Sequence, residues 1–153
     1  MGKINWSRVI LGGLVAGVII NIFEGVTNAG FLQDQWTTVM TGLNKTAAFS
    51  TKQIVFFNIA GFAIGIFTIL AYALMRPRLG AGVNTALCAG ALMWIVGNAI
   101  PNSFNVVTHL FPIDLMLKLT AVGLVELLLA SVAGAAIYKE DAAPQAMNAA
   151  AGR

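Results

Sequence analysis

The sequence predicts an all-α, polytopic membrane protein in which four transmembrane helices form a compact bundle. Of its 153 residues, 58% are hydrophobic and only 10% are charged, whereas about a quarter of a soluble domain is charged. The mean hydropathy is +0.82, and most charged residues stand at the ends of apolar runs. Four of these runs are long enough to cross a bilayer, which takes about 20 residues.

The first predicted span, residues 9–32, carries Asn21, Glu24 and Asn28 on one helical face. An ionised carboxylate in hydrocarbon costs about 2.5 to 3.5 kcal/mol even on the lenient insertion scale. Glu24 should therefore be protonated, partnered or turned toward other protein. A basic start followed by an apolar run is also typical of a secretory signal, but Glu24 is awkward in such a segment. We therefore interpret the run as a transmembrane helix.

The loop after the first span holds apolar residues at helical spacing. Trp36, Met40 and Leu43 recur among Thr, Asn and Gln residues, a pattern that favours a short amphipathic helix over residues 34–43 on the membrane surface. A plain interfacial loop is the alternative.

The second span is predicted at residues 53–75, an uncharged run that Arg76 stops. The third begins near residue 82, in an uncharged stretch too long for one straight crossing. Pro101 divides it, so a helix over residues 82–100 should kink or end there. Residues 102–111 would then form an outer cap or a helical extension.

The fourth span is predicted at residues 115–138, after Pro112, with Glu126 as the charge in its apolar part. The four spans make a single transmembrane domain over residues 1–139. Residues 140–153, rich in Ala, are predicted to be a flexible cytoplasmic tail.

Basic residues set the predicted orientation. An even number of spans places both termini on one side, together with Lys3, Arg8, Arg76, Arg78, Lys139 and Arg153, whereas the other side has Lys45, Lys52 and Lys118. Because cytoplasmic loops are enriched in Lys and Arg, we expect both termini to be cytoplasmic, in a bacterial-type inner membrane. These scattered charges form no patch for nucleic acid.

A faint internal repeat is visible between the first and third spans. An offset of 77 residues pairs Gly13 with Gly90 and Asn21 with Asn98. The fourth span matches the second at a different offset. The chain is therefore either two repeated hairpins, as in some transporters, or a single design with chance matches.

Small residues four apart recur on each predicted span. Such residues let helix backbones approach closely where lipid provides no hydrophobic drive. The same faces could also meet a second copy, in a homo-oligomer, or another protein of a larger membrane complex. The glycines among these predicted packing residues are Gly13, Gly17, Gly61, Gly65, Gly90 and Gly134.

Two acids and several amides lie at a similar predicted depth in the outer half of the membrane. Two carboxylates in a low dielectric do not both ionise readily, so they could share a proton or bind a small cation together. The alternative is structural, because asparagines and protonated glutamates also hydrogen-bond helices together at about 0.6 kcal/mol each. The candidates are Glu24 and Glu126, framed by Asn21, Asn28, Asn58 and Asn98.

Other functional classes find no support. The single cysteine, Cys88, excludes an intrachain disulfide framework and a cysteine-cluster metal site, and is predicted to be a buried hydrophobe. His109 is the only histidine, so no metal site is expected. Phosphate-loop, serine-hydrolase and metalloprotease motifs are absent from the sequence. We expect no cofactor and no catalysis.

Two resemblances accompany these patterns. Residues 5–17, Asn-Trp-Ser-Arg-Val-Ile-Leu-Gly-Gly-Leu-Val-Ala-Gly, look like uncharacterised four-span bacterial membrane proteins. The outline of four spans with a glutamate in the first resembles the small multidrug resistance transporters, which implies that Glu24 exchanges protons for cationic drugs. The chain departs from them in its long first loop and in Glu126. We expect a non-enzymatic protein with a structural polar core, a subunit of a larger complex, or alternatively a proton- or cation-coupled transporter.

Overall fold

The computed structural model describes residues 4–46 and 49–139, and every regular element in these ranges is helical. Four helical stretches are long and apolar enough to cross a membrane: Trp6–Phe31, Thr51–Leu79, Val83–Val107 and Ile113–Ile137. The prediction of an all-helical chain with four membrane-length helices is confirmed. The predicted tail at residues 140–153 lies outside the described residues.

The first long helix combines α1 (Trp6–Val26) with a π-helical turn, η1 (Thr27–Phe31). Asn5 caps its start, because its side-chain oxygen accepts a hydrogen bond of 3.0 Å from the backbone N–H of Arg8. At its end the backbone N–H of Leu32 donates to the Thr27 carbonyl five residues back, at 2.9 Å. The wider turn shifts the residues that follow Thr27 around the helix axis.

A short helix, α2 (Gln33–Gly42), occupies the loop where residues 34–43 were predicted to be helical. It packs against the start of the last long helix, since Leu32 forms a buried cluster with Leu115 and Met116, and Trp36 packs on this cluster. The apolar side of α2 therefore has a protein partner, and α2 covers one end of the molecule.

The second long helix, α3 (Thr51–Leu79), is longer than the predicted residues 53–75. Ser50 and Gln53 form a capping box at its start. The helix continues past Arg76 because basic side chains in a last turn complement the helix dipole. It ends at Gly80, whose φ of 83° is a conformation that glycine adopts readily.

The third long helix is continuous, and the alternative of a helix that ends at Pro101 is wrong. It consists of α4 (Val83–Trp94), the π turn η2 (Ile95–Ala99) and α5 (Ile100–Val107). A proline in an α-helix lacks an N–H and clashes with the carbonyl four residues earlier. In η2 the Ile100 N–H donates to the Ile95 carbonyl instead, and this wider turn accommodates the proline ring.

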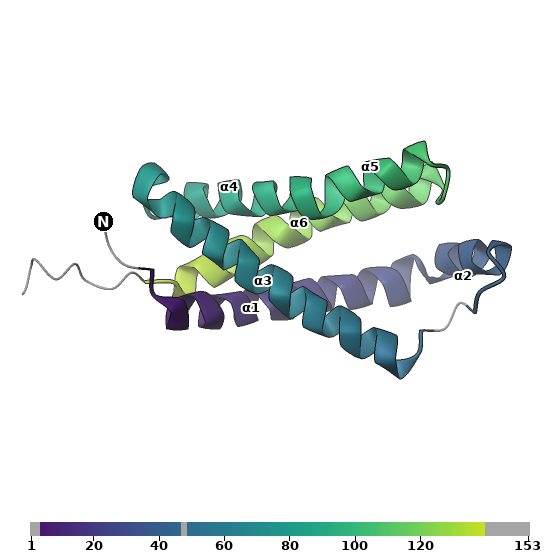
Figure 1. Ribbon diagram of the computed structural model, residues 1–153, viewed down its shortest axis with the longest axis horizontal. Helices are drawn as coiled ribbons and strands as arrows, with labels where there is room; N and C mark the ends of the chain where they lie inside the picture. Colours follow the sequence, from purple (N-terminus) through teal and green to yellow (C-terminus); the bar gives the residue numbers. More distant parts are fainter. Residues whose placement is uncertain (1–3, 47–48, 140–153) are drawn as a thin grey trace, which may run out of the picture.

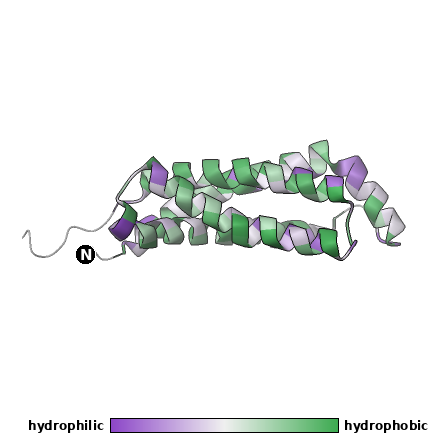
Figure 2. Ribbon diagram, turned by 90° about the horizontal axis from the view of Figure 1, so that it is seen from above, coloured by the Kyte–Doolittle hydropathy of each residue, from purple (hydrophilic) through white to green (hydrophobic). Residues whose placement is uncertain are grey.

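The last long helix is α6 (Ile113–Ile137), which begins directly after Pro112, two residues before the predicted start at residue 115. α1 packs along α3 and α6, and α4 packs along α6. Figure 1 shows the α3–α4 turn and the end of α6 near the start of α1, which we call the terminal end, and α2 and α5 at the opposite α2 end. In Figure 2 the long helices are hydrophobic over most of their length.

Glycines bring the helix backbones together. A Cβ at Gly13 would lie 2.5 Å from Ile66 Cα, and one at Gly12 would lie 2.5 Å from the Gly134 carbonyl oxygen. Such distances leave no room for a side chain. All six glycines of the predicted packing set lie at similarly close contacts with a neighbouring helix: Gly13, Gly17, Gly61, Gly65, Gly90 and Gly134.

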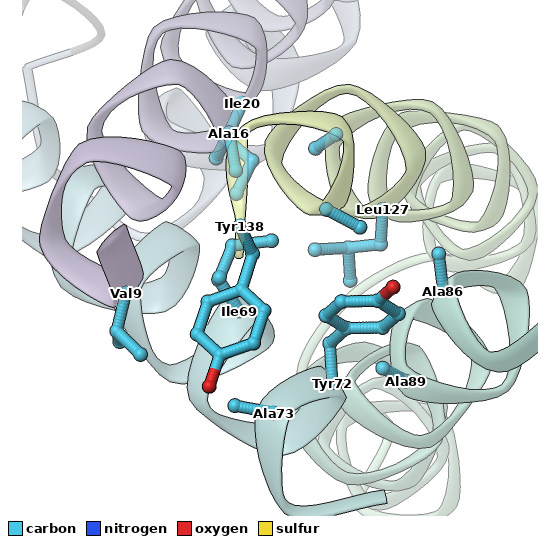
Figure 3. Packing of buried hydrophobic residues seen from close by; sticks show 12 residues of the cluster. Val9, Ala16, Ile20, Ile69, Tyr72, Ala73, Ala86, Ala89, Leu127 and Tyr138 are labelled. Carbon is cyan, nitrogen blue, oxygen red and sulfur yellow. The ribbon is translucent and has the colours of Figure 1, made fainter. Parts of the chain in front are cut away.

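The main apolar core lies on the terminal half of the molecule, where all four long helices meet (Figure 3). Tyr72 and Tyr138 pack edge to face there, with ring centroids 5.8 Å apart. The Arg76 guanidinium lies 5.4 Å from the centroid of the Tyr138 ring. Cys88 is exposed on α4, so the prediction that it is buried is wrong. Its side chain faces away from this core because α4 turns other residues, including Ala86 and Ala89, inward.

The structure gives no support to an internal repeat. An offset of 77 residues would place the counterpart of η1 at residues 104–108, whereas the second π turn spans Ile95–Ala99. The helix α2 also separates α1 from α3, while no described helix lies between α5 and α6. Duplication of a hairpin therefore stays a prediction.

Candidate functional site

A cavity of about 170 Å³ lies toward the α2 end, between α1, α2, the η2–α5 segment and α6. Both membrane glutamates line it: Glu24 near the end of α1 and Glu126 in the middle of α6. Asn28 and Asn98, two of the predicted amides, line it as well. Residues more than 100 positions apart in the chain are thus brought to one polar space.

One wall of the cavity is a relay of three side chains. The Asn28 amide nitrogen donates to the Glu24 carboxylate at 2.6 Å. The Asn28 amide oxygen accepts a hydrogen bond of 2.8 Å from the indole N–H of Trp36. The Trp36 ring packs edge to face on Phe111, with centroids 5.7 Å apart. This relay connects the first acid to α2.

The opposite wall is a second network that fixes Asn98. The Asn102 amide nitrogen donates to the Asn98 amide oxygen and to the Thr120 hydroxyl, each at 3.0 Å. The Thr120 hydroxyl in turn donates to the Met116 carbonyl at 2.7 Å. The Asn98 amide lies directly against the backbone of Gly123, where a Cβ would collide with it. Glycine at this position therefore lets Asn98 reach the cavity.

Glu126 has no such support. Its relative exposure is 4%, yet no other described residue donates a hydrogen bond to its carboxyl group. Burial of a polar group without a hydrogen-bond partner is costly, and burial of an unpaired charge costs more. The carboxyl group lines the cavity, so water or a ligand that enters the cavity can form a hydrogen bond with it.

The cavity is acceptor-rich and carries no described basic residue on its walls. The Asn28 and Asn102 amide nitrogens are already used in the two wall networks, whereas the Asn98 amide nitrogen and the Thr27 hydroxyl donate to no other described residue. Glu24 is exposed on the surface of the isolated chain, so the cavity is partly open where Glu24 lines it. The space therefore presents carboxylate oxygens to whatever enters it.

Two predicted members of the site lie elsewhere. The Asn21 amide nitrogen donates to the backbone carbonyl of Asn58 at 3.2 Å, and the Asn21 side chain fits against Gly61. The Asn58 amide nitrogen donates to the Ile54 carbonyl of its own helix at 2.8 Å. The prediction that Asn21 and Asn58 frame the two glutamates is not what the structure has. They connect α1 to α3, because the face of α1 that holds Asn21 is the one that α3 covers.

Six lining residues were not part of the predicted site: Thr27, Trp36, Asn102, Leu119, Val122 and Gly123. Asn102 follows Asn98 by one helical turn, so their shared face was a usable signal. Trp36 gave no signal, because its role depends on the packing of α2. Within the described residues no group of three His, Cys, Asp or Glu side chains could hold a metal ion.

The chain matches no model of a known protein family, no curated protein and no solved structure. Its candidate function is therefore inferred from the cavity itself.

Proposed function

We propose that this chain is a non-enzymatic integral membrane protein that takes up protons or a small cation between Glu24 and Glu126, as a proton- or cation-coupled transporter. The observation that carries the proposal is the Glu126 carboxyl group, which is buried, faces the cavity and receives no hydrogen bond from a described residue. Intramembrane acids that face an internal cavity commonly mark ion and proton pathways.

The alternative is that Glu126 has a structural role and holds helices together, which would require a different set of contacts. A glutamate that holds helices together must donate or accept a hydrogen bond across a helix interface. The amides and hydroxyls do this: Asn21 bonds α1 to α3, and Asn102 bonds α5 to α6. Glu126 does not. The asparagines therefore suit a structural role, and the glutamates suit a binding role.

The predicted orientation places the cavity in the outer half of the membrane, because the terminal end is expected to be cytoplasmic. A cation attracted from the periplasm would pass α2 before it reached the acids. The relay from Trp36 through Asn28 to Glu24 connects these two places. An occupied site would thus be coupled to the position of α2.

A second candidate function is a structural subunit of a larger inner-membrane complex or of a homo-oligomer. The observation that favours it is the start of α3, where every residue from Thr51 to Ile59 is exposed in the chain alone. This stretch includes Asn58, a polar residue that protein would accommodate better than lipid. A partner that purifies with the chain in fixed stoichiometry would support this candidate.

The test measures protons released by the purified protein in weakly buffered detergent solution on addition of NaCl, KCl, CaCl₂ or n-propylammonium chloride. If a cation competes with protons for the two acids, the wild-type protein releases protons on addition of at least one salt. Glu24→Gln and Glu126→Gln should each reduce this release.

Asp114→Asn is the matched control, because Asp114 is an acid on the exposed surface, paired with Lys118 at 3.4 Å. It should leave the release unchanged. If no salt releases more protons from the wild-type protein than from the Glu24→Gln, Glu126→Gln double variant, the proposed function is wrong.

A further inference from the structure

We infer that the ligand of this cavity is a small primary ammonium cation, that is, a protonated primary amine with a short apolar chain. This inference rests on the proposed function and names the class of its substrate. Three features carry it: the free hydrogen-bonding groups, the volume of the cavity and the mixture of polar and apolar surface on its walls.

The charged groups that stay free on the walls are carboxylate oxygens, beside two neutral donors, the Asn98 amide nitrogen and the Thr27 hydroxyl. Glu126 offers both carboxyl oxygens, and the Glu24 oxygen that Asn28 does not bond is also free. A primary ammonium group has three N–H donors and no acceptor. A charged donor bonded to a carboxylate makes one of the stronger hydrogen bonds in proteins. A quaternary ammonium ion has no N–H group and would leave the buried Glu126 oxygens without a partner.

The volume argues against a bare metal ion. A water molecule occupies about 30 Å³ of liquid, and an apolar cavity of about 150 Å³ holds benzene. The cavity of about 170 Å³ thus has room for several non-hydrogen atoms. Calcium takes six to eight oxygen ligands, whereas the described walls contain no group of three acidic, histidine or cysteine side chains that could supply a metal site.

The remaining wall is apolar. Leu119 and Val122 lie on α6 beside Gly123, one turn or two before Glu126, and all three line the cavity. An ammonium group at Glu126 would thus place its carbon chain along these side chains, where burial of apolar surface is favourable. A hydrated inorganic cation would gain nothing from this wall.

The experiment compares n-propylammonium, tetramethylammonium, sodium and calcium chlorides at matched ionic strength, with proton release and isothermal titration calorimetry as readouts. We expect n-propylammonium to bind. Tetramethylammonium should bind at least about a hundredfold more weakly, because a site built for hydrogen-bond donors rejects analogues that lack them. Glu126→Gln should weaken n-propylammonium binding.

Val122→Phe tests the apolar wall by filling it, and should weaken n-propylammonium binding about tenfold or more. Val125→Phe is its matched control, since Val125 lies on the same helix and is 51% exposed, outside the cavity. Equal loss in both variants would refute the placement of the chain along Val122.

The outcomes separate this inference from the function on which it rests. If sodium or calcium displaces protons through Glu24 and Glu126 while n-propylammonium does not, the ammonium assignment is wrong and the cation-binding function stands. If tetramethylammonium binds as well as n-propylammonium, the role given to N–H donors is wrong. If neither these four cations nor potassium displaces protons, both proposals fail.

Discussion

The backbone contact between α1 and α3 at Gly65 provides a sharp stability test, the substitution Gly65→Ala. A Cβ at Gly65 would lie 2.5 Å from the backbone nitrogen of Gly17 and 2.9 Å from its Cα, and would also collide with the Gly13 carbonyl oxygen. These are backbone atoms of α1, so no side-chain rotation can relieve the contact. The α1 and α3 helices must move apart.

The cost follows from this geometry. Insertion of one carbon into a well-packed contact costs typically about 1 to 3 kcal/mol, and the rigid backbone at Gly65 favours the upper half of this range. Alanine returns up to about 1 kcal/mol through its helix propensity. The net loss in the free energy of unfolding should be about 1 to 3 kcal/mol.

Gly25→Ala is the matched control, because Gly25 lies on α1 and a Cβ there would have no atom within 4 Å. This variant should gain up to about 1 kcal/mol, since only helix propensity changes. Reversible unfolding in mixed micelles, followed by far-UV circular dichroism, measures both. A Gly65→Ala protein as stable as the wild type or as Gly25→Ala would refute the close approach of α1 and α3.

Further substitutions examine the cavity and the surface. Glu126→Leu should raise the free energy of unfolding by about 1 kcal/mol, because it removes an unpartnered buried carboxyl group; a loss in mixed-micelle unfolding would show that Glu126 is structural. Trp36→Phe removes the N–H that bonds Asn28 and should cost about 1 kcal/mol in the same assay. Lys118→Met breaks the exposed pair with Asp114 and should change stability by less than about 0.5 kcal/mol. Fusions to the C-terminus should fluoresce with green fluorescent protein and lack alkaline phosphatase activity; the reverse would refute the predicted orientation.

The sequence alone predicted the number of membrane-length helices, because hydropathy over about 20 residues is a strong signal. It was less accurate at the helix ends. α3 continues past Arg76 because basic side chains are favourable in the last turn of a helix. The third helix passes through Pro101 because the π turn before it accommodates the proline ring. A π turn has no composition that marks it in one sequence.

The sequence predicted the depth of the site residues along their helices, but not which of them face each other, and this difference has a physical cause. Glu24 and Asn98 could be placed at one level by counting residues, since depth depends only on rise per residue. Which residues face each other depends on the rotation of each helix, and that is set by contacts. Asn21 lies on the same helical face as Glu24, yet its side chain packs against Gly61 of α3 and does not enter the cavity. Trp36 enters the site only because Leu32 anchors α2 on α6.

The position of the cavity follows from where the helices are pressed together. α1 and α6 meet at Gly12 and Gly134, near the terminal end, at a separation that excludes any side chain. Glu24 lies twelve residues further along α1, a rise of about 18 Å, where the cavity lined by Glu24 and Glu126 lies between the same two helices. Antiparallel helices held tightly at one end and kept apart by polar side chains at the other must leave a space between them. The glycine contacts therefore create the cavity as much as the acids that line it, and substitutions such as Gly134→Ala should alter ligand affinity from a distance.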